Sequence, residues 1–234
     1  MTEIRTETFP LTDGSELRLT VAEPETAVRG GLVVLHEARG VTDAVRGLVS
    51  SLAEEGWLAV APHLYHRDGA DELDAADGDD RVRDQVNRLS GESVLADTDA
   101  SFVWLAEHGV RDDQMGVVGY GLGGSVAMVV AASRTLGAAV TISGGGILSP
   151  VSEGLPSLVE VAGELTCPWL GIYTDADPSV RHEDVEKLRE AASTAGVATD
   201  VVRYPAPVDP AEDDAKAAAD AWQRTLNWFD SHLR

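Results

Sequence analysis

VGYGLGGSVAM, residues Val118–Met128, joins one short apolar run to another through a cluster of glycines. The residues from Met115 to Gly119 are rich in valine and predict a strand, and Leu122–Ser133 has the composition of a buried helix. A strand that enters a helix through a tight turn is the setting in which many hydrolases hold a nucleophilic side chain. Gly121 stands where that nucleophile would be, so this turn carries no reactive group.

The rest of the chain alternates short apolar runs with stretches of helical spacing. An alternating run predicts an edge strand at Glu16–Pro24. The other expected strands are Gly30–Glu37, Trp57–Pro62, Met115–Gly119, Ala138–Ser143, Trp169–Thr174 and Thr199–Tyr204, and the expected helices are Thr42–Glu55, Ser93–Glu107, Leu122–Ser133, Glu183–Ala195 and Ala211–His232. This alternation indicates an α/β fold with a mostly parallel central sheet flanked by helices on both faces.

The composition is that of an ordinary globular protein, with 44% hydrophobic and 25% charged residues. No repeat or linker divides the sequence, so we expect a single domain over residues 1–234. A formal net charge of −22 would repel nucleic acids and anionic membranes, which argues against both as partners. Without a membrane-length apolar run or signal-peptide features, and with a single cysteine, the sequence predicts a cytoplasmic protein.

Five stretches of the chain carry a family resemblance. They are VVLHEARGV (33–41), LAEEGWLAVAPHLYHRDG (52–69), VGYGLGGSVAM (118–128), CPWLGIYTDADPSV (167–180) and AWQRTLNWFDSHL (221–233). In this order they resemble the pocket turn, the next helix and loop, the elbow, the acid-bearing strand end and the last helix of the dienelactone hydrolase family. The resemblance runs from about residue 30 to the C-terminus and implies an α/β-hydrolase fold.

The resemblance also implies acyl-transfer chemistry. In this family a cysteine at the elbow attacks an ester or lactone carbonyl, a histidine moves protons, an aspartate orients the histidine, and backbone N–H groups stabilise the oxyanion. Carried over by position, the cysteine is replaced by Gly121 and the aspartate is Asp177. No histidine follows Tyr204 at the expected place, where Asp209 stands nearest. Asp177 is then the one remaining member of the triad.

Several further residues are expected around the pocket. The resemblance places Glu37 beside the nucleophile position, and Leu122 and Ala38 at the oxyanion site. Tyr65 and Tyr120 are expected to line or brace the cavity.

Arg67 and His36 each have two interpretations. Arg67 resembles a position near which family members present arginine to a substrate carboxylate, and a salt bridge with the acidic segment 68–80 explains it equally well. His36 lies either at the pocket or in the interior as a hydrogen-bonded histidine, because strand alternation turns it away from Glu37.

Two serines and two histidines are candidates for other chemistry. Ser143 could act as a nucleophile, but no histidine stands nearby in the pattern to activate it, and Ser125 is expected to point into the core. His63 and His66 form an H-x-x-H pair that lacks a third ligand at matching spacing. We therefore expect neither a metal nor a cofactor.

Three functions fit these residues. The first is a family member that no longer hydrolyses esters or lactones and keeps a pocket for a small carboxylic or lactone-like ligand. The second is an enzyme of altered chemistry, such as an isomerase, cyclase or hydratase, in which Glu37, Asp177, His36 or a tyrosine moves protons. Asp177 and Asp209 could also form an acid–base pair if the two carboxylates lie close together. The third is an active hydrolase with a relocated nucleophile, which the loss of two triad members makes hardest to sustain.

Overall fold

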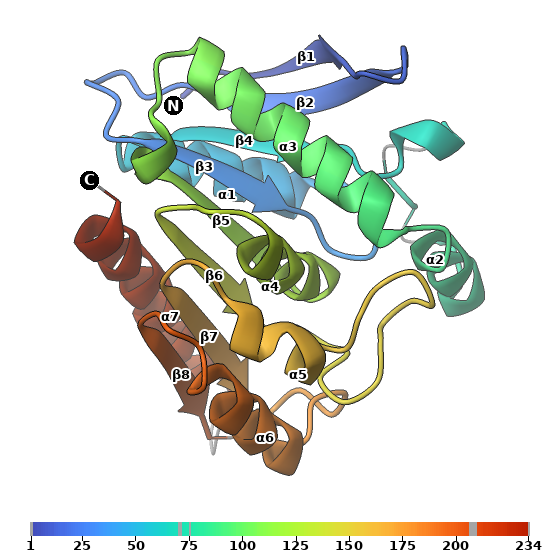
Figure 1. Cartoon of the computed structure of the whole chain (residues 1–234), viewed down its shortest axis with the longest axis vertical. Coiled ribbons are helices and arrows are strands. Elements are labelled where there is room, and N and C mark those ends of the chain that lie inside the picture. The colour runs from blue at the N-terminus through green and yellow to red at the C-terminus, as the bar shows by residue number, and fades with distance from the viewer. Residues whose placement is uncertain (1, 70–71, 75, 206–209, 234) are drawn as a thin grey trace.

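An eight-stranded sheet forms the centre of the computed structural model, which describes residues 2–69, 72–74, 76–205 and 210–233, the side chains of 210–214 excepted. The strands are β1 (Ile4–Pro10), β2 (Glu16–Ala22), β3 (Gly31–Leu35), β4 (Leu58–Pro62), β5 (Met115–Tyr120), β6 (Ala138–Ile142), β7 (Trp169–Thr174) and β8 (Thr199–Tyr204). Their order across the sheet is β1-β2-β4-β3-β5-β6-β7-β8 (Figure 1). β2 pairs antiparallel with β1 and β4, and the other neighbouring pairs are parallel.

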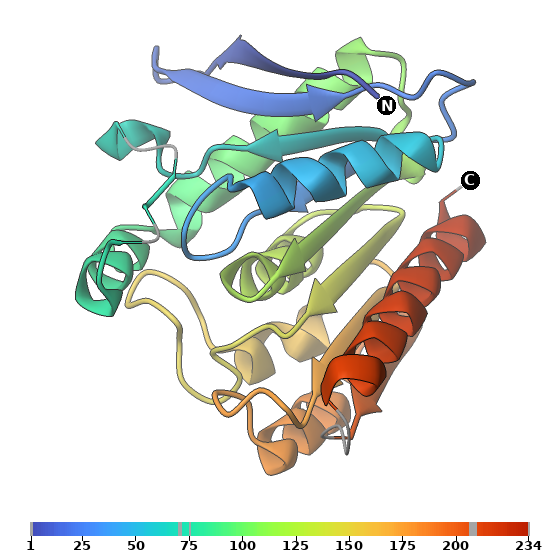
Figure 2. The same cartoon turned by 180° about the vertical axis from the view of Figure 1, so that it is seen from behind.

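Helices cover both faces of this sheet. Within the described residues they are α1 (Asp43–Glu54), α2 (Asp79–Val86), α3 (Gly91–Glu107), α4 (Leu122–Ser133), α5 (Leu158–Val161), α6 (His182–Ala192) and α7 (Pro210–His232). α3, α4, α5 and α6 lie on the face turned toward the viewer in Figure 1, and α1 and α7 lie on the opposite face (Figure 2). None of these helices is long and apolar enough to cross a membrane. The arrangement is that of the expected α/β-hydrolase fold.

Each face of the sheet has its own hydrophobic core, because successive side chains of a buried strand point to opposite faces. In β3, Val33 and Leu35 belong to the core under α3 and α4, and Leu32 and Val34 belong to the core under α1 and α7. Phe229 of α7 is fully buried in the second core. The two cores fix the sheet between the helix layers and hold its strand ends in place.

The expectation for the N-terminal part of the sheet is wrong in one respect. The run Glu16–Pro24, expected at the edge, forms the second strand, because β1 pairs along its outer side from Ile4↔Ala22 to Pro10↔Glu16. β1 was missed because its side chains alternate between exposed and half-buried, which requires few apolar residues. The helix α2 was missed for a similar reason, since its polar sequence buries Gln85 and Val86.

The parallel strands end at a common edge of the sheet. Leu35 of β3 pairs with Gly119 of β5, and Tyr120 pairs with Ile142 of β6, so the loops that follow these strands begin side by side. In open α/β sheets, ligands bind at the carboxyl ends of the strands. The candidate site residues follow this edge.

Candidate functional site

The turn between β5 and α4 is a sharp elbow at Gly121, with φ and ψ of 52° and −118°. Residues with a side chain rarely adopt this conformation, and glycine adopts it without a Cβ penalty. The Gly121 N–H donates to the carbonyl of Ile142 at 2.9 Å, and the Gly121 carbonyl accepts from the N–H of Ser125 at 3.1 Å. Backbone hydrogen bonds thus hold the elbow against β6 and α4.

The space that a side chain at residue 121 would occupy is open. A Cβ atom there would lie 3.5 Å from Oε1 and 3.9 Å from Cγ of Glu37, which are ordinary contact distances. Glu37 stands two residues after the end of β3, at the same edge of the sheet. The structure therefore brings together the two positions that the resemblance places side by side.

A pocket of about 280 Å³ opens beside Glu37. Its lining comes from β3 and the residues after it, from the first half of α1 and from the end of β5: Val34, Leu35, Glu37, Ala44, Val45, Leu48 and Tyr120. Sequence reasoning missed Ala44, Val45 and Leu48 as pocket residues. An apolar stripe on a helix has the same spacing whether it packs in a core or walls a pocket.

Glu37 and Tyr120 supply the polar side chains of this pocket. Glu37 is exposed, and its carboxylate makes no hydrogen bond or ion pair with the described residues. Burial, with a smaller contribution from the charge of Glu37, raises the pKa of Tyr120 to about 12. The Tyr120 hydroxyl therefore stays protonated at neutral pH and can donate a hydrogen bond to a ligand.

Two backbone N–H groups near the elbow have no acceptor within the described part of the chain. They belong to Leu122, the first residue of α4, and to Ala38. The first N–H groups of a helix lack intrahelical acceptors and lie at the positive end of its dipole. Such groups stabilise a carbonyl oxygen that gains negative charge. They are the two residues for which the resemblance implies oxyanion contacts.

His36 lies in the interior, with a side chain that is 0% exposed. Its Nδ1 donates to the carbonyl of Glu37 at 2.7 Å, and its Nε2 accepts from the N–H of Leu64 at 3.1 Å. Because the carbonyl can only accept and the amide can only donate, these bonds fix the neutral ring with its proton on Nδ1. The ring packs edge-on against Tyr65, whose hydroxyl donates to the carbonyl of Ala38 at 2.9 Å. Of the two interpretations of His36, the structure shows the second: it is a buried, hydrogen-bonded histidine.

We expect His36 to make stability depend on pH. Burial lowers the pKa of His36 to about 4, whereas a histidine in the unfolded chain has a pKa of about 6.5. Between these values the unfolded state binds more protons, so the free energy of unfolding falls as the pH falls, by about 3 kcal/mol in all. Urea denaturation of wild type and His36→Asn across this window measures the effect.

The His36→Asn variant should lose stability less steeply than wild type as the pH falls, because asparagine does not titrate. His63, whose pKa burial also lowers to about 4, is present in both proteins and cancels in the comparison. Equal slopes for the two proteins would contradict the neutral, buried state of His36.

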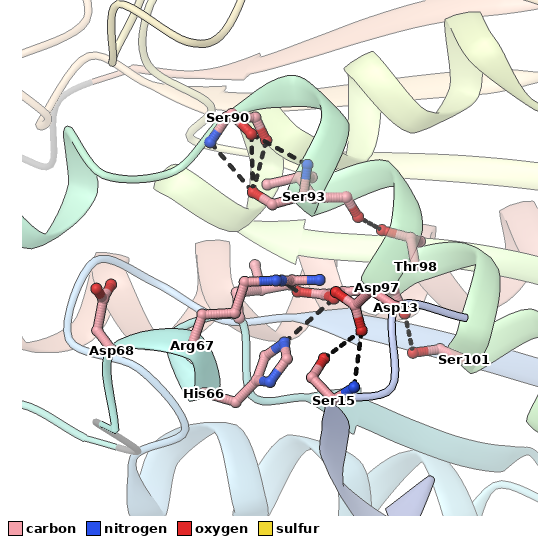
Figure 3. A network of polar contacts seen from close by, with 12 residues as sticks. Asp13, Ser15, His66, Arg67, Asp68, Ser90, Ser93, Asp97, Thr98 and Ser101 are labelled. Atoms are coloured by element: carbon pink, nitrogen blue, oxygen red, sulfur yellow. Dashed lines mark hydrogen bonds and ion pairs between the residues drawn. The ribbon is translucent and has the colours of Figure 1, made fainter. Parts of the chain in front are cut away.

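Arg67 contacts α3 instead of the pocket (Figure 3). Its Nη1 donates to Oδ2 of Asp97 at 2.7 Å, and Nε2 of His66 lies 3.2 Å from Oδ1 of the same carboxylate. The Asp97 side chain is 1% exposed. The salt bridge expected with segment 68–80 is therefore, among the described residues, a salt bridge with α3. Sequence spacing could not show this, because Asp97 lies 30 residues beyond Arg67.

The two histidines of the H-x-x-H pair contact different residues. His63 places Nε2 2.8 Å from the hydroxyl of Thr20, and His66 contacts Asp97. Across the described residues, no group of three or more His, Cys, Asp or Glu side chains is placed to hold a metal ion. Cys167 is buried in a hydrophobic core, which raises the pKa of its thiol to about 12.

Neither serine candidate is hydrogen-bonded to a histidine. The hydroxyl of Ser125 is buried and donates to the carbonyl of Gly145 at 2.8 Å. Ser143 follows β6 with a φ of 51°, and its N–H donates to the carbonyl of Ile172 at 2.8 Å. The Ser143 hydroxyl makes no hydrogen bond within the described chain. Activation of a serine requires a positioned base, which neither residue has here.

Asp177 lies half-buried in the loop after β7. Its Oδ1 accepts from the N–H of Ser179 at 2.8 Å and from the Ser179 hydroxyl at 2.6 Å, which closes a local turn. Asp209, the residue nearest the expected histidine, lies outside the described residues. The proximity of Asp177 and Asp209 thus stays a prediction.

All six histidines lie in the described part of the chain, and none of them lines the pocket. Three of them make the contacts given above, Nδ1 of His108 donates to the carbonyl of Trp104 at 2.7 Å, and the other two lie at the start of α6 and the end of α7. The pocket therefore has a carboxylate and a phenol for proton transfer, and no imidazole.

The sequence profile of the dienelactone hydrolase family matches residues 17–233. The chain belongs to this family. A Yersinia pestis protein provisionally named carboxymethylenebutenolidase is 31% identical, over 97% of this chain and 88% of that protein. A carboxymethylenebutenolidase of Rhodococcus opacus is 27% identical, over 91% of this chain and 85% of that protein. The crystal structure of a Klebsiella pneumoniae protein provisionally named dienelactone hydrolase matches with a TM-score of 0.85 at 30% identity, over 97% of this chain and 99% of that chain. Family membership confirms the α/β-hydrolase fold.

Proposed function

We propose that this family member does not hydrolyse esters or lactones through an elbow nucleophile, and that it binds a small lactone-like molecule in the pocket beside Glu37. The observation that carries the proposal is the open position at Gly121, which holds no nucleophilic atom. Acyl transfer of the family type needs a nucleophile and a base that activates it. In this chain the nucleophile position holds Gly121, and no histidine follows Tyr204 at the position of the base.

The surroundings of the remaining triad residue support the same proposal. The Oδ1 of Asp177 is engaged by Ser179, and no histidine lines the pocket that Asp177 could orient. In a triad whose members act together, loss of the nucleophile or of the base alone removes most of the rate. Ser143 and Ser125 do not restore a pair, because neither is hydrogen-bonded to a histidine in the described residues.

The pocket favours an uncharged ring over a carboxylate as its ligand. Its walls are apolar apart from Glu37 and Tyr120, and Glu37 has no cationic partner among the described residues. A carboxylate ligand would meet the like charge of Glu37 without compensation. The names of the relatives refer to a butenolide, an unsaturated lactone, that carries a carboxymethylene group. The lactone ring fits the apolar walls of this pocket, whereas the carboxylate of that group would meet the charge of Glu37. Of the two expected ligand classes, we therefore propose the lactone.

An ester assay tests the first part of the proposal. We expect nitrophenyl acetate to be hydrolysed no faster with the wild-type protein than in buffer alone, because no nucleophile lies at the elbow. Ser143→Ala is the matched variant for a relocated nucleophile and should behave like wild type. Turnover by wild type that Ser143→Ala abolishes would overturn the proposal and show that the nucleophile lies at Ser143, directly after β6.

Thermal unfolding with the parent butenolide tests the second part. A ligand that binds the folded state raises the melting temperature with its concentration. We expect this rise in wild type and its loss in Ala44→Phe, which places a ring at the pocket wall. Glu54→Phe adds the same ring at the other end of α1, where residue 54 is exposed, and should keep the response. A wild-type protein that does not respond at millimolar butenolide would contradict the proposed pocket ligand.

A further inference from the structure

The Glu37 carboxylate lies at the open elbow and makes no hydrogen bond or ion pair with the described residues. Structural carboxylates of this chain are engaged by donors, as Asp97 is by Arg67, whereas Glu37 has no partner in the described residues. Its Oε1 lies 3.5 Å from the place where a side chain at residue 121 would begin. The carboxylate is therefore free to contact a molecule that occupies the space beside Gly121.

Hydrogen-bond donors lie on the residues next to Glu37 and Gly121 in the chain. The N–H groups of Leu122 and Ala38 have no acceptor within the described chain, and Tyr120 lines the pocket together with Glu37. A carboxylate next to unused donors is the arrangement that removes a proton beside a carbonyl group. The base takes the proton, and the donors stabilise the negative charge that moves to the carbonyl oxygen.

We propose that Glu37 is a catalytic base that moves the double bond of a β,γ-unsaturated lactone into conjugation with its carbonyl. The inference rests on the proposed binding of a lactone in this pocket and adds the reaction. The carbonyl oxygen accepts from the N–H groups of Leu122 and Ala38, and the adjacent carbon faces Glu37 through the space left by Gly121.

The reaction balances without a co-reactant. Glu37 removes a proton from the α carbon, and the electron pair of that C–H bond passes through the ring to the carbonyl oxygen, which gives a dienolate. The protonated Glu37 then returns the proton to the γ carbon, the α,β double bond forms, and the carbonyl is restored. The enzyme regains its carboxylate, and the lactone is isomerised without gain or loss of atoms.

Glycine at residue 121 serves this reaction in two ways. It leaves room for the ring atoms next to Glu37, because a Cβ at this position would stand in the space in front of Oε1. It also spares the product, since a nucleophile at the elbow would attack the same carbonyl and open the ring. The change that removes hydrolysis therefore provides the conditions for proton transfer.

Proton NMR of α-angelica lactone in deuterated buffer tests the proposal in a single experiment. This β,γ-unsaturated lactone gives distinct signals for each fate: deuterium at the α carbon or the conjugated β-angelica lactone for proton transfer, and the open-chain keto acid for hydrolysis. We expect the full-length protein to accelerate deuterium exchange and isomerisation, with ring opening left at the rate of buffer alone.

Glu37→Gln tests the role of the carboxylate with little change of shape. It should lower kcat for isomerisation by at least about 100-fold, the usual contribution of a general base, while the thermal response to the parent butenolide stays close to that of wild type. Glu54→Gln removes an exposed carboxylate at the far end of α1 and should leave both measurements unchanged.

The outcomes separate this inference from the proposed function. Isomerisation that Glu37→Gln abolishes without loss of binding supports both. Binding without exchange or isomerisation, or isomerisation that survives in Glu37→Gln, overturns the role of Glu37 and leaves lactone binding intact. Absence of any binding overturns both, and enzymatic ring opening overturns the claim that the protein is not a hydrolase.

Discussion

Gly123→Ala should lower the free energy of unfolding by about 3 kcal/mol or more, because the surrounding backbone cannot move aside. A Cβ at residue 123 would lie 2.1 Å from the carbonyl oxygen of Leu35 and 2.7 Å from that of His36. These atoms end β3, so relief of the clash would move α4 away from the sheet or displace the turn that carries Glu37. Urea denaturation measures the loss, and a low yield of folded protein would be its extreme form.

Gly47→Ala is the matched control for this change. Gly47 lies in α1 on the surface, and a Cβ there would meet no atom within 4 Å. Alanine loses less backbone entropy than glycine in a helix, so this variant should be more stable than wild type by about 0.5–1 kcal/mol. Equal stability of Gly123→Ala and wild type would contradict the close packing of α4 on β3.

Asp97→Ala is expected to cost about 3 kcal/mol of stability, at the lower end of the range for a broken buried ion pair. The Asp97 side chain is 1% exposed, whereas Arg67 is 32% exposed and can regain part of its hydration when its partner is lost. The carboxylate also contacts His66, so its removal releases the loop after β4 from α3 (Figure 3). Thermal or urea unfolding measures the effect.

Asp99→Ala offers a comparison two residues further along α3. Asp99 also pairs with an arginine, Arg134, but both side chains are partly exposed, at 42% and 37%. Exposed pairs contribute about 0–1 kcal/mol, so this variant should lose much less than Asp97→Ala. Similar losses of unfolding free energy in the two variants would show that the buried Asp97–Arg67 pair stabilises the fold no more than the exposed Asp99–Arg134 pair.

The sheet and the elbow could be predicted from the sequence because burial on both faces leaves a continuous apolar run. β3, β4 and β6 are buried at every residue, and their sequences show it directly. The glycine cluster could be interpreted as a tight turn because a strand precedes it and a helix follows it, and the resemblance placed Gly121 at the nucleophile position. β1 and α2 escaped prediction because half-buried elements need few apolar residues.

The candidate site was predictable in its positions and less so in its contacts. Glu37, Tyr120 and Gly121 lie at strand ends, so the strand assignment alone places them at one edge. The partners of Arg67 and His36 depend on α3 and on the loop after β4, which are distant in sequence. The pocket wall on α1 could not be told from a core stripe, because the spacing of apolar residues is the same in both.

The positive φ of Gly121 at the elbow has a consequence for which mutations this protein tolerates there. A glycine codon that ends in a pyrimidine differs by one base from codons for cysteine and for serine, so from such a codon a nucleophile at residue 121 is one point mutation away. Such a mutation would find open space beside Glu37, and its cost would be the strain of a side chain at a φ of 52°, about 1–3 kcal/mol. It would still find no histidine at the pocket. A nucleophile at residue 121 would therefore also need a base that the pocket does not supply, so a single substitution at this residue does not build the nucleophile–base pair of the family.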